Sequence, residues 1–360
     1  MMEQDAVSLI GWYRKNKRSL PWRDTGDPED VWISEIMLQQ TRVEAVKEYF
    51  IRFREALPDA AAIAACPDDR LMKLWEGLGY YSRARNLKKC AQVLVEQYGG
   101  KLPADHGELL KLPGIGPYTA GAIASIAFGL PVPAVDGNVL RVWARITGCT
   151  DDIALDATKR LFTWEIAALL ELMSRSTGDF RAGDYNQALM ELGATVCVPN
   201  GAPLCGHCPM NHRCEALSEG LTGLIPVKSV KKPRRREERT ILVIRDGERF
   251  FFRKRPSKGL LAGLYEFPGA EGFLTQEQAV DAVRALGFDP VRAVPLPAGK
   301  HIFTHIEWHM EAWEVRVSGF PAELPAEKRD SAILVTKEEL SQFAVPSAFR
   351  TWTEYYALKD

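Results

Sequence analysis

Four of the seven cysteines in this chain fall within eighteen residues, and this cluster constrains the fold more than any other feature. The segment reads Cys197-x7-Cys205-x2-Cys208-x5-Cys214. Four thiolates so close together can enclose one [4Fe-4S] cluster or one tetrahedral zinc ion. The spacing does not choose between these metals, because His207 and His212 lie close enough to act as zinc ligands. An odd cysteine total with such clustering favours a metal site over disulfides.

The segment from Val31 to about Leu217 has the pattern of successive amphipathic helices. Its apolar residues recur at three- and four-residue spacing, and the runs end at proline or glycine. Thr41 to Glu44 has capping-box spacing before a helical run that ends at Leu57. Gly99-Gly100 is expected to end a helix that begins near Tyr80. We therefore predict an all-helical domain that includes the cysteine segment.

Length and composition set broader limits. A chain of 360 residues with 46% hydrophobic residues can form two or three domains with buried cores. A formal net charge of -1 gives no global sign of a polyanionic partner, so a nucleic-acid contact would be a local patch. The chain starts without a basic region followed by an apolar core, and no apolar run reaches the ~20 residues of a membrane span. We expect a cytoplasmic, intracellular protein with no membrane contact.

A basic segment separates the helical part of the chain from a part with residues typical of β-strands. Residues 228–239 carry seven Lys or Arg against two Glu, a local charge of +5, which indicates a basic linker or simply a solvated connection. Beyond this segment, one helical stretch is expected at Gln276 to Leu286. Residues rich in β-branched and aromatic side chains occupy Thr240 to Ile244, Arg249 to Lys254 and Trp308 to Val317. We predict domains at residues 1–222 and 240–360, the second of them α+β, with a linker at 223–239.

A glycine-rich turn lies between two helical stretches of the first domain. It reads Leu-Pro-Gly-Ile-Gly-Pro-Tyr, from Leu112 to Tyr118. Gly114 and Gly116 permit a backbone turn that few other residues could make. The helix that follows begins with free N–H groups, which together with the helix dipole form a phosphate site. Such a site would bind a nucleic-acid backbone rather than read bases; the alternative is an ordinary turn between helices.

Two carboxylates are candidates for acid–base chemistry. The helical neighbours of Glu35 are mostly apolar, so desolvation would raise its pKa and keep it protonated near neutral pH, as a general acid requires. Asp136 precedes a helix expected to start near Asn138, and the helix dipole there would hold the carboxylate ionised. An ionised carboxylate suits the stabilisation of a developing sugar cation. The alternatives are a structural glutamate and a simple helix cap.

Four features together resemble one superfamily. They are Glu35 in Glu-Ile-Met-Leu-Gln-Gln-Thr, the turn at Leu112 to Tyr118, Asp136 twenty residues after Gly116, and the cysteine segment. From about Leu20 to Cys214 the chain resembles the helix-hairpin-helix DNA glycosylases of the endonuclease III type, and within them the adenine DNA glycosylases. The resemblance implies an all-α, two-lobed catalytic domain that flips its target base. It also implies a [4Fe-4S] cluster, although similar proteins usually have six residues between the first two cysteines, not seven.

The resemblance extends to individual contacts. Bifunctional relatives carry a lysine nucleophile immediately after the hairpin, where this chain has Tyr118, which cannot form a Schiff base. The resemblance places Gln39, Gln40 and Thr41 against the opposite base or the DNA. Leu78 and Tyr80 resemble residues that wedge into the base stack, with core packing as the alternative. The expected lining of the adenine pocket is Arg18, Leu20, Trp22 and Arg23.

The C-terminal domain resembles, more weakly, the Nudix-like domain that recognises 8-oxoguanine. Tyr265 to Gly269 and His301 to His305 carry this resemblance, whereas Ala279 to Gly287 lacks the acidic metal-binding helix of a working Nudix hydrolase. We expect Phe303-Thr304-His305 to read 8-oxoguanine through the Thr304 hydroxyl, where similar enzymes often carry serine; the alternative is a plain strand edge. One strand face would also collect a candidate metal-binding set, His301, His305 and His309.

These features predict a monomeric, monofunctional enzyme that removes adenine mispaired with 8-oxoguanine or guanine in double-stranded DNA. Glu35 would protonate an adenine ring nitrogen, and Asp136 would stabilise the sugar cation, with Tyr118 and Asn138 positioning both. One alternative is a pyrimidine-lesion glycosylase with lyase activity, which Tyr118 and the additional domain oppose. The other is a DNA-lesion sensor without chemistry, which the intact carboxylates oppose.

Overall fold

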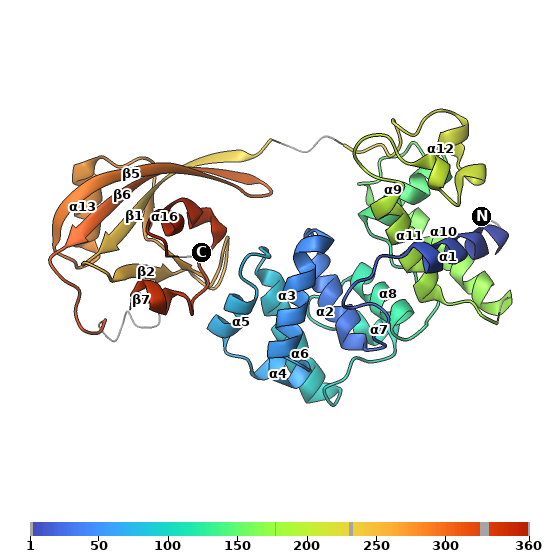
Figure 1. Cartoon of the computed structure of the whole chain (residues 1–360), viewed down its shortest axis with the longest axis horizontal. Helices are drawn as coiled ribbons and strands as arrows, with labels where there is room; N and C mark the ends of the chain where they lie inside the picture. The colour runs from blue at the N-terminus through green and yellow to red at the C-terminus, as the bar shows by residue number, and fades with distance from the viewer. Residues whose placement is uncertain (1–2, 177, 230–232, 325–330, 359–360) are drawn as a thin grey trace. The chain divides into compact units, whose positions relative to one another are not determined.

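The chain is organised into two compact units. The computed structural model describes residues 3–176, 178–229, 233–324 and 331–358 (Figure 1). The first unit comprises Met1–Ala65 and Asn86–Val230, and the second comprises Cys66–Arg85 and Lys231–Asp360. Lys231 and Lys232 of the expected basic linker lie outside the described residues. No helix in the described ranges is both long and apolar enough to cross a membrane.

Every regular element described in the first unit is helical, as the periodicity predicted. The helices that lie wholly in this unit are α1 (Glu3–Asn16), α2 (Pro28–Leu38), α3 (Val43–Ala56), α4 (Ala60–Ala65), α7 (His106–Leu109), α8 (Pro117–Ile126), α9 (Gly137–Ile146), α10 (Asp156–Ser176), α11 (Ala182–Thr195), η1 (Cys205–His207), η2 (Asn211–Arg213) and α12 (Glu215–Ser218). Helix α6 (Ser82–Gln97) begins in the second unit and continues into the first. Helix α11 is central, since it contacts α1, α8 and α9.

Two glycines set how closely the elements around α8 and α9 approach one another. A Cβ on Gly121 of α8 would lie 2.1 Å from the carbonyl oxygen of Pro133, so only glycine lets residues 131–135 cross this helix. A Cβ on Gly193 of α11 would lie 2.7 Å from the Cβ of Asn138. These contacts fix the chain immediately before and after Asp136.

The predicted helix boundaries were partly right. Helix α6 ends at Gln97, and Gly99 and Gly100 follow with φ of 62° and 78°, the left-handed conformation that glycine adopts without a steric penalty. The capping box at Thr41 to Glu44 was wrong, because α3 begins at Val43 with Arg42 as its N-cap. The chain turns at Gln40, where φ is 58°, and the Thr41 hydroxyl donates back to the Gln39 carbonyl instead of capping the helix.

Among its described residues, the second unit contains a seven-stranded sheet in which five strands follow the order β3-β2-β1-β6-β5. Of the other two strands, β4 pairs with β1 and β7 pairs with β2. Strands β1 and β6 are parallel, and the other pairs are antiparallel. The strands are β1 (Arg235–Arg245), β2 (Phe250–Lys254), β3 (Tyr265–Glu266), β4 (Gly269–Glu271), β5 (Pro290–Ile302), β6 (Ile306–Val317) and β7 (Ala332–Val335). The remaining elements are α5 (Asp68–Leu74), α13 (Gln276–Ala285), α15 (Lys337–Leu340), η3 (Ser347–Phe349) and α16 (Arg350–Tyr355).

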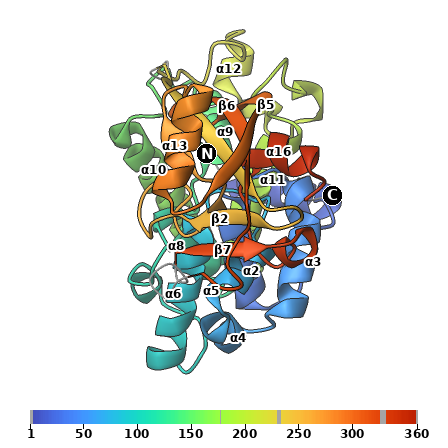
Figure 2. The same cartoon turned by 90° about the vertical axis from the view of Figure 1, so that its left-hand side faces the viewer.

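Successive side chains of β1 point to opposite faces of the sheet, so a separate hydrophobic core forms on each face. Ile241 and Val243 pack with the C-terminal residues Phe349 and Trp352, whereas the intervening side chains pack with α13. Figure 2 shows α13 and α16 on different sides of the strands. The prediction of an α+β second domain is therefore confirmed, but the regular structure of this domain begins earlier than predicted. Residues 235–239, expected to be linker, form the first part of β1 and pair with β6.

The chain reverses direction between β5 and β6. His301 lies on β5 opposite Trp308 on β6, and the Phe303 N–H donates to the Ile306 carbonyl across the turn. The expectation that His301, His305 and His309 share one strand face was therefore wrong. The reason is that the sequence 303–305, which looked like continuous strand, closes a hairpin.

Candidate active site

A cleft of about 800 Å³ in the first unit collects most of the residues singled out from the sequence. The loop before α2, α2 itself, the glycine-rich turn, the start of α9 and α11 line it. The sequence-predicted residues in its lining are Arg18, Leu20, Trp22, Arg23, Glu35, Gln39, Gln40, Thr41, Gly114, Gly116, Tyr118, Asp136 and Asn138. Segments more than one hundred residues apart thus supply a single concave surface.

Glu35 is a buried carboxyl group in this cleft. It lies on α2, which Asp27 caps by accepting a hydrogen bond from the Glu29 N–H. Only 8% of Glu35 is exposed, and the Tyr118 hydroxyl donates a hydrogen bond of 2.6 Å to its Oε2. Burial is the main cause that raises the pKa of Glu35 to about 7, and the negative charge of Asp136 adds to this effect. The hydrogen bond from Tyr118 and the positive charge of Arg23 act in the opposite direction and lower the pKa. Glu35 can therefore both donate and accept a proton near neutral pH.

Asp136 is the N-cap of α9, as predicted. Its Oδ1 accepts hydrogen bonds from the N–H groups of Asn138, at 2.9 Å, and Val139, at 2.8 Å. Its Oδ2 accepts from the Asn138 side-chain nitrogen at 2.8 Å, and the Arg141 guanidinium in turn donates to Oδ1 of Asn138. Burial raises the pKa of Asp136 and exceeds the lowering effect of these hydrogen bonds. The sequence had indicated only the effect of the helix N-terminus, because burial depends on packing.

Tyr118 connects the glycine-rich turn to Glu35. Gly114 adopts φ of 79°, and a Cβ there would lie 2.7 Å from the Cβ of Asn86, so the turn requires glycine at this position. Gly116 is the N-cap of α8, which begins at Pro117 and places Tyr118 in its first turn. Burial, with the charges of Glu35 and Asp136, raises the pKa of Tyr118 well above its usual value, so the phenol stays neutral and acts as a donor.

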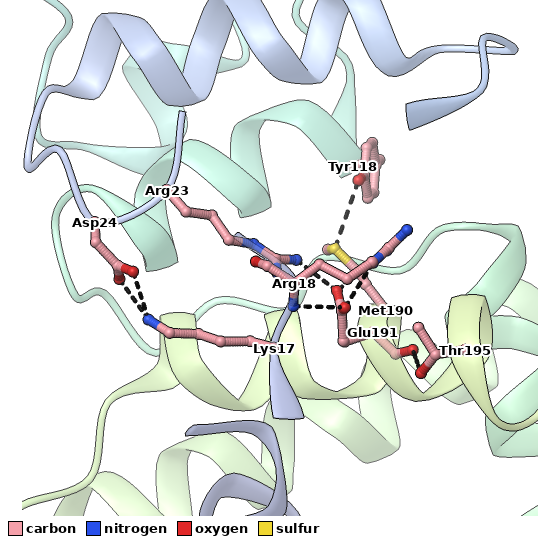
Figure 3. A network of polar contacts seen from close by, with 8 residues as sticks. All are labelled: Lys17, Arg18, Arg23, Asp24, Tyr118, Met190, Glu191 and Thr195. Atoms are coloured by element: carbon pink, nitrogen blue, oxygen red, sulfur yellow. Dashed lines mark hydrogen bonds and ion pairs between the residues drawn. The ribbon is translucent and has the colours of Figure 1, made fainter. Parts of the chain in front are cut away.

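Sequence reasoning missed the contribution of α11 to the cleft. Gln187, Met190 and Glu191 of this helix line it, and Met190 Sδ lies 3.7 Å from the Tyr118 hydroxyl. Figure 3 shows Arg18 and Arg23 converging on Glu191. A signal was present, since Glu191 lies between the apolar residues Met190 and Leu192, but its partners are about 170 residues away in the sequence.

The four clustered cysteines line one pocket elsewhere in the first unit. The Arg145 guanidinium donates a hydrogen bond of 3.3 Å to Cys197 Sγ, and burial, with the neighbouring thiols, raises the pKa of Cys208 to about 11. The pocket lining includes neither histidine considered as a zinc ligand, and His212 instead contacts Asp5. Within the described ranges, no three His, Cys, Asp or Glu side chains are already arranged to hold a metal ion.

The remaining predicted DNA contacts belong to the second unit. Leu78 is buried, whereas Tyr80 is 45% exposed and its hydroxyl lies 2.8 Å from the Thr304 hydroxyl. The Phe303 ring packs against Trp308, with a centroid distance of 4.9 Å, and the side chains of Thr304 and His305 are exposed. One cluster in this unit therefore contains Tyr80 and the segment 303–305.

Comparisons with known proteins agree with this fold. Residues 33–166 match the HhH-GPD superfamily of base excision DNA repair proteins, and residues 240–355 match the NUDIX domain. A solved thermostable thymine-DNA glycosylase is 30% identical, with a TM-score of 0.51 over 59% of this chain and 95% of that chain. The molecule is thus a helix-hairpin-helix DNA glycosylase, an enzyme of base-excision repair.

Curated relatives show to which family of DNA glycosylases the chain belongs. The adenine DNA glycosylase of Mus musculus is 34% identical over 95% of this chain and 76% of its own length. That of Homo sapiens is 33% identical over 95% of this chain and 72% of its own length. The chain belongs to the adenine DNA glycosylase family.

Proposed function

We propose that this enzyme hydrolyses the N-glycosidic bond of adenine mispaired with 8-oxoguanine or guanine in double-stranded DNA. The observation that carries the proposal is the buried carboxyl of Glu35, with a pKa of about 7, in a cleft that also contains Asp136. A purine leaves readily only when a ring nitrogen is protonated, and a group with this pKa can supply the proton at neutral pH. The names of the relatives support adenine as the base.

In the proposed mechanism, adenine is extruded from the duplex into the cleft. Glu35 protonates a ring nitrogen, and the glycosidic bond breaks toward an oxocarbenium-like sugar. Asp136, held by the N–H groups of Asn138 and Val139, stabilises the positive charge, and ionised Glu35 then activates water. Tyr118 orients the Glu35 carboxyl through its 2.6 Å hydrogen bond.

The enzyme is proposed to be monofunctional. Lyase chemistry needs an amine that can form a Schiff base, and Tyr118 at the lysine position of bifunctional relatives has none. Lys159 also lines the cleft, but its ammonium pairs with Asp156 at 3.1 Å. The Tyr118 hydroxyl supports acid catalysis instead, through its bond to Glu35.

We propose that Cys197, Cys205, Cys208 and Cys214 hold a [4Fe-4S] cluster. Their thiols fit this group by chemistry, since all four line one pocket and a guanidinium donates to one sulfur. The cluster would supply covalent cross-linking of residues 197–214, a structural role, and no catalytic step is assigned to it. Neither candidate histidine is among the residues that line the pocket, which supports iron over zinc.

Recognition of the opposite base is proposed for Phe303, Thr304 and His305. The exposed Thr304 hydroxyl can hydrogen-bond the altered edge of 8-oxoguanine, while Phe303, packed on Trp308, stays rigid beside it. The function is tested by base release from three duplexes, which carry adenine opposite 8-oxoguanine, adenine opposite guanine, or an oxidised pyrimidine. Adenine release, fastest opposite 8-oxoguanine and without strand cleavage, is expected. Release of the oxidised pyrimidine with strand cleavage would refute the proposal.

A further inference from the structure

Glu191 is a fully buried carboxylate that binds two arginines of the cleft wall. Its side chain is 0% exposed, although glutamate is rarely buried without partners. Its Oε1 accepts from the Arg18 side chain at 2.7 Å and from the Arg18 backbone N–H at 3.1 Å. Its Oε2 accepts from Arg23 at 2.6 Å and from the second Arg18 nitrogen at 3.2 Å (Figure 3).

We propose that Glu191 is a positioning residue for base excision, which holds Arg18 and Arg23 in the wall of the cleft and compensates the charge of Arg23 beside Glu35. The inference rests on the proposed function of Glu35 as the acid. Glu191 touches neither reacting carboxylate in the structure, so it acts through the arginines.

The geometry of the three residues supports the positioning role. Arg23 also donates to the Arg18 carbonyl oxygen at 2.9 Å, and its guanidinium lies 5.6 Å from the centre of the Tyr13 ring. Arg23 is therefore held from several directions, whereas the Arg18 guanidinium is held by Glu191. Burial tends to raise the pKa of Glu191, but the hydrogen bonds from Arg18 and Arg23 outweigh this effect and lower it. The carboxylate is consequently ionised at neutral pH and carries a full negative charge.

The electrostatic role follows from the surroundings of Glu35. Three groups act on Glu35 directly: Tyr118 of α8, Asp136 before α9 and Arg23 before α2. The other charged residues that line the same cleft are Arg18 before α2, Lys159 of α10 and Glu191 of α11. Arg23 is the cation that lowers the pKa of Glu35. Glu191 reduces this effect by binding the guanidinium, so an uncharged residue at position 191 would leave Arg23 uncompensated and lower the pKa of Glu35 further.

The test is the pH profile of single-turnover adenine excision from a duplex with adenine opposite 8-oxoguanine. For Glu191→Gln, we expect the alkaline decline of the rate to move down by about 0.5 to 1 pH unit, which lowers the rate above pH 7 by about three- to tenfold. Glu191→Asp keeps the charge and should retain the wild-type midpoint. Arg23→Gln should move the midpoint in the opposite direction, so the idea can be tested even if Glu191→Gln does not fold.

A matched control removes a comparable carboxylate away from the cleft. Glu165 of α10 accepts a 2.6 Å hydrogen bond from Trp143 and does not line the cleft, so Glu165→Gln should leave the profile unchanged. A Glu191→Gln profile that superimposes on the wild type, or a uniform loss of rate without a shifted midpoint, would overturn the inference. Failure of the wild-type enzyme to release adenine would instead refute the proposed function, before any variant is compared.

Discussion

The Tyr118 hydroxyl lies 2.6 Å from Oε2 of Glu35 and joins the helix that follows the glycine-rich turn to the helix that carries the acid. The two residues are 83 positions apart in the sequence. The helix that follows this turn, which is expected to bind the DNA backbone, therefore also orients the carboxyl that is proposed to act as the acid. A DNA contact at residues 114–116, as proposed, would be connected to Glu35 through the Tyr118 side chain.

Replacement of Glu35 by Gln should abolish adenine excision and leave duplex affinity nearly unchanged. The amide keeps the size of the carboxyl but cannot donate the acid proton, and loss of a general acid costs on the order of 10²- to 10⁴-fold in rate. Single-turnover excision and fluorescence anisotropy measure the two quantities. Excision near the wild-type rate would rule out Glu35 as the acid.

Asp136→Asn should slow the chemical step by on the order of a hundredfold or more, because the amide carries no charge to stabilise the sugar cation. Asparagine is about as good an N-cap as aspartate, so the melting temperature should change little. This substitution thus separates charge from capping. Normal turnover together with an unchanged melting temperature would show that Asp136 is only a cap.

The excision rate should fall as pH rises through about 7, because Glu35 then loses the proton it must donate. Tyr118→Phe removes a hydrogen bond that lowers the pKa of Glu35, so the decline should move to higher pH. Rates from about pH 5 to 9, with each enzyme in single turnover, provide the comparison. A decline that moves to lower pH would contradict the assigned role of this bond.

The purified protein should be brown and contain about four iron atoms per chain, as expected for a [4Fe-4S] centre on four thiolates. Replacement of Cys208 by Ser should lower both the visible absorption and the iron content. Elemental analysis of anaerobically prepared protein is the decisive measurement. Colourless protein with one zinc per chain would reverse the choice of metal.

Thr304→Ala should reduce the preference for 8-oxoguanine over guanine by about two- to tenfold, the value of one hydrogen bond of about 0.5 to 1.5 kcal/mol. Thr304→Ser keeps the hydroxyl and should keep the preference. Tyr80→Phe is a useful comparison, because it removes the partner of Thr304 in the free protein without removing the proposed lesion contact. Equal preference in Thr304→Ala and the wild type would place lesion recognition elsewhere.

The sequence by itself determined the features that depend on near neighbours. Asp136 caps α9 because its carboxylate reaches N–H groups two and three residues away. The glycine pair after α6 and the three strand segments predicted at 240–244, 249–254 and 308–317 follow from similarly local preferences. The capping box at Thr41 failed because a left-handed residue at Gln40 moved the start of α3 by one position.

Only the tertiary structure decided what depends on packing between distant segments. The ion pairs of Glu191 with Arg18 and Arg23 span 173 and 168 residues, and no local pattern encodes which cation meets a buried carboxylate. Burial likewise raised the pKa of Asp136, against the effect of the helix N-terminus. The grouping of Cys66–Arg85 with the second unit had no counterpart in the sequence pattern. Helix and strand preferences act over a few residues, whereas desolvation and charge compensation depend on the whole set of neighbours that folding assembles.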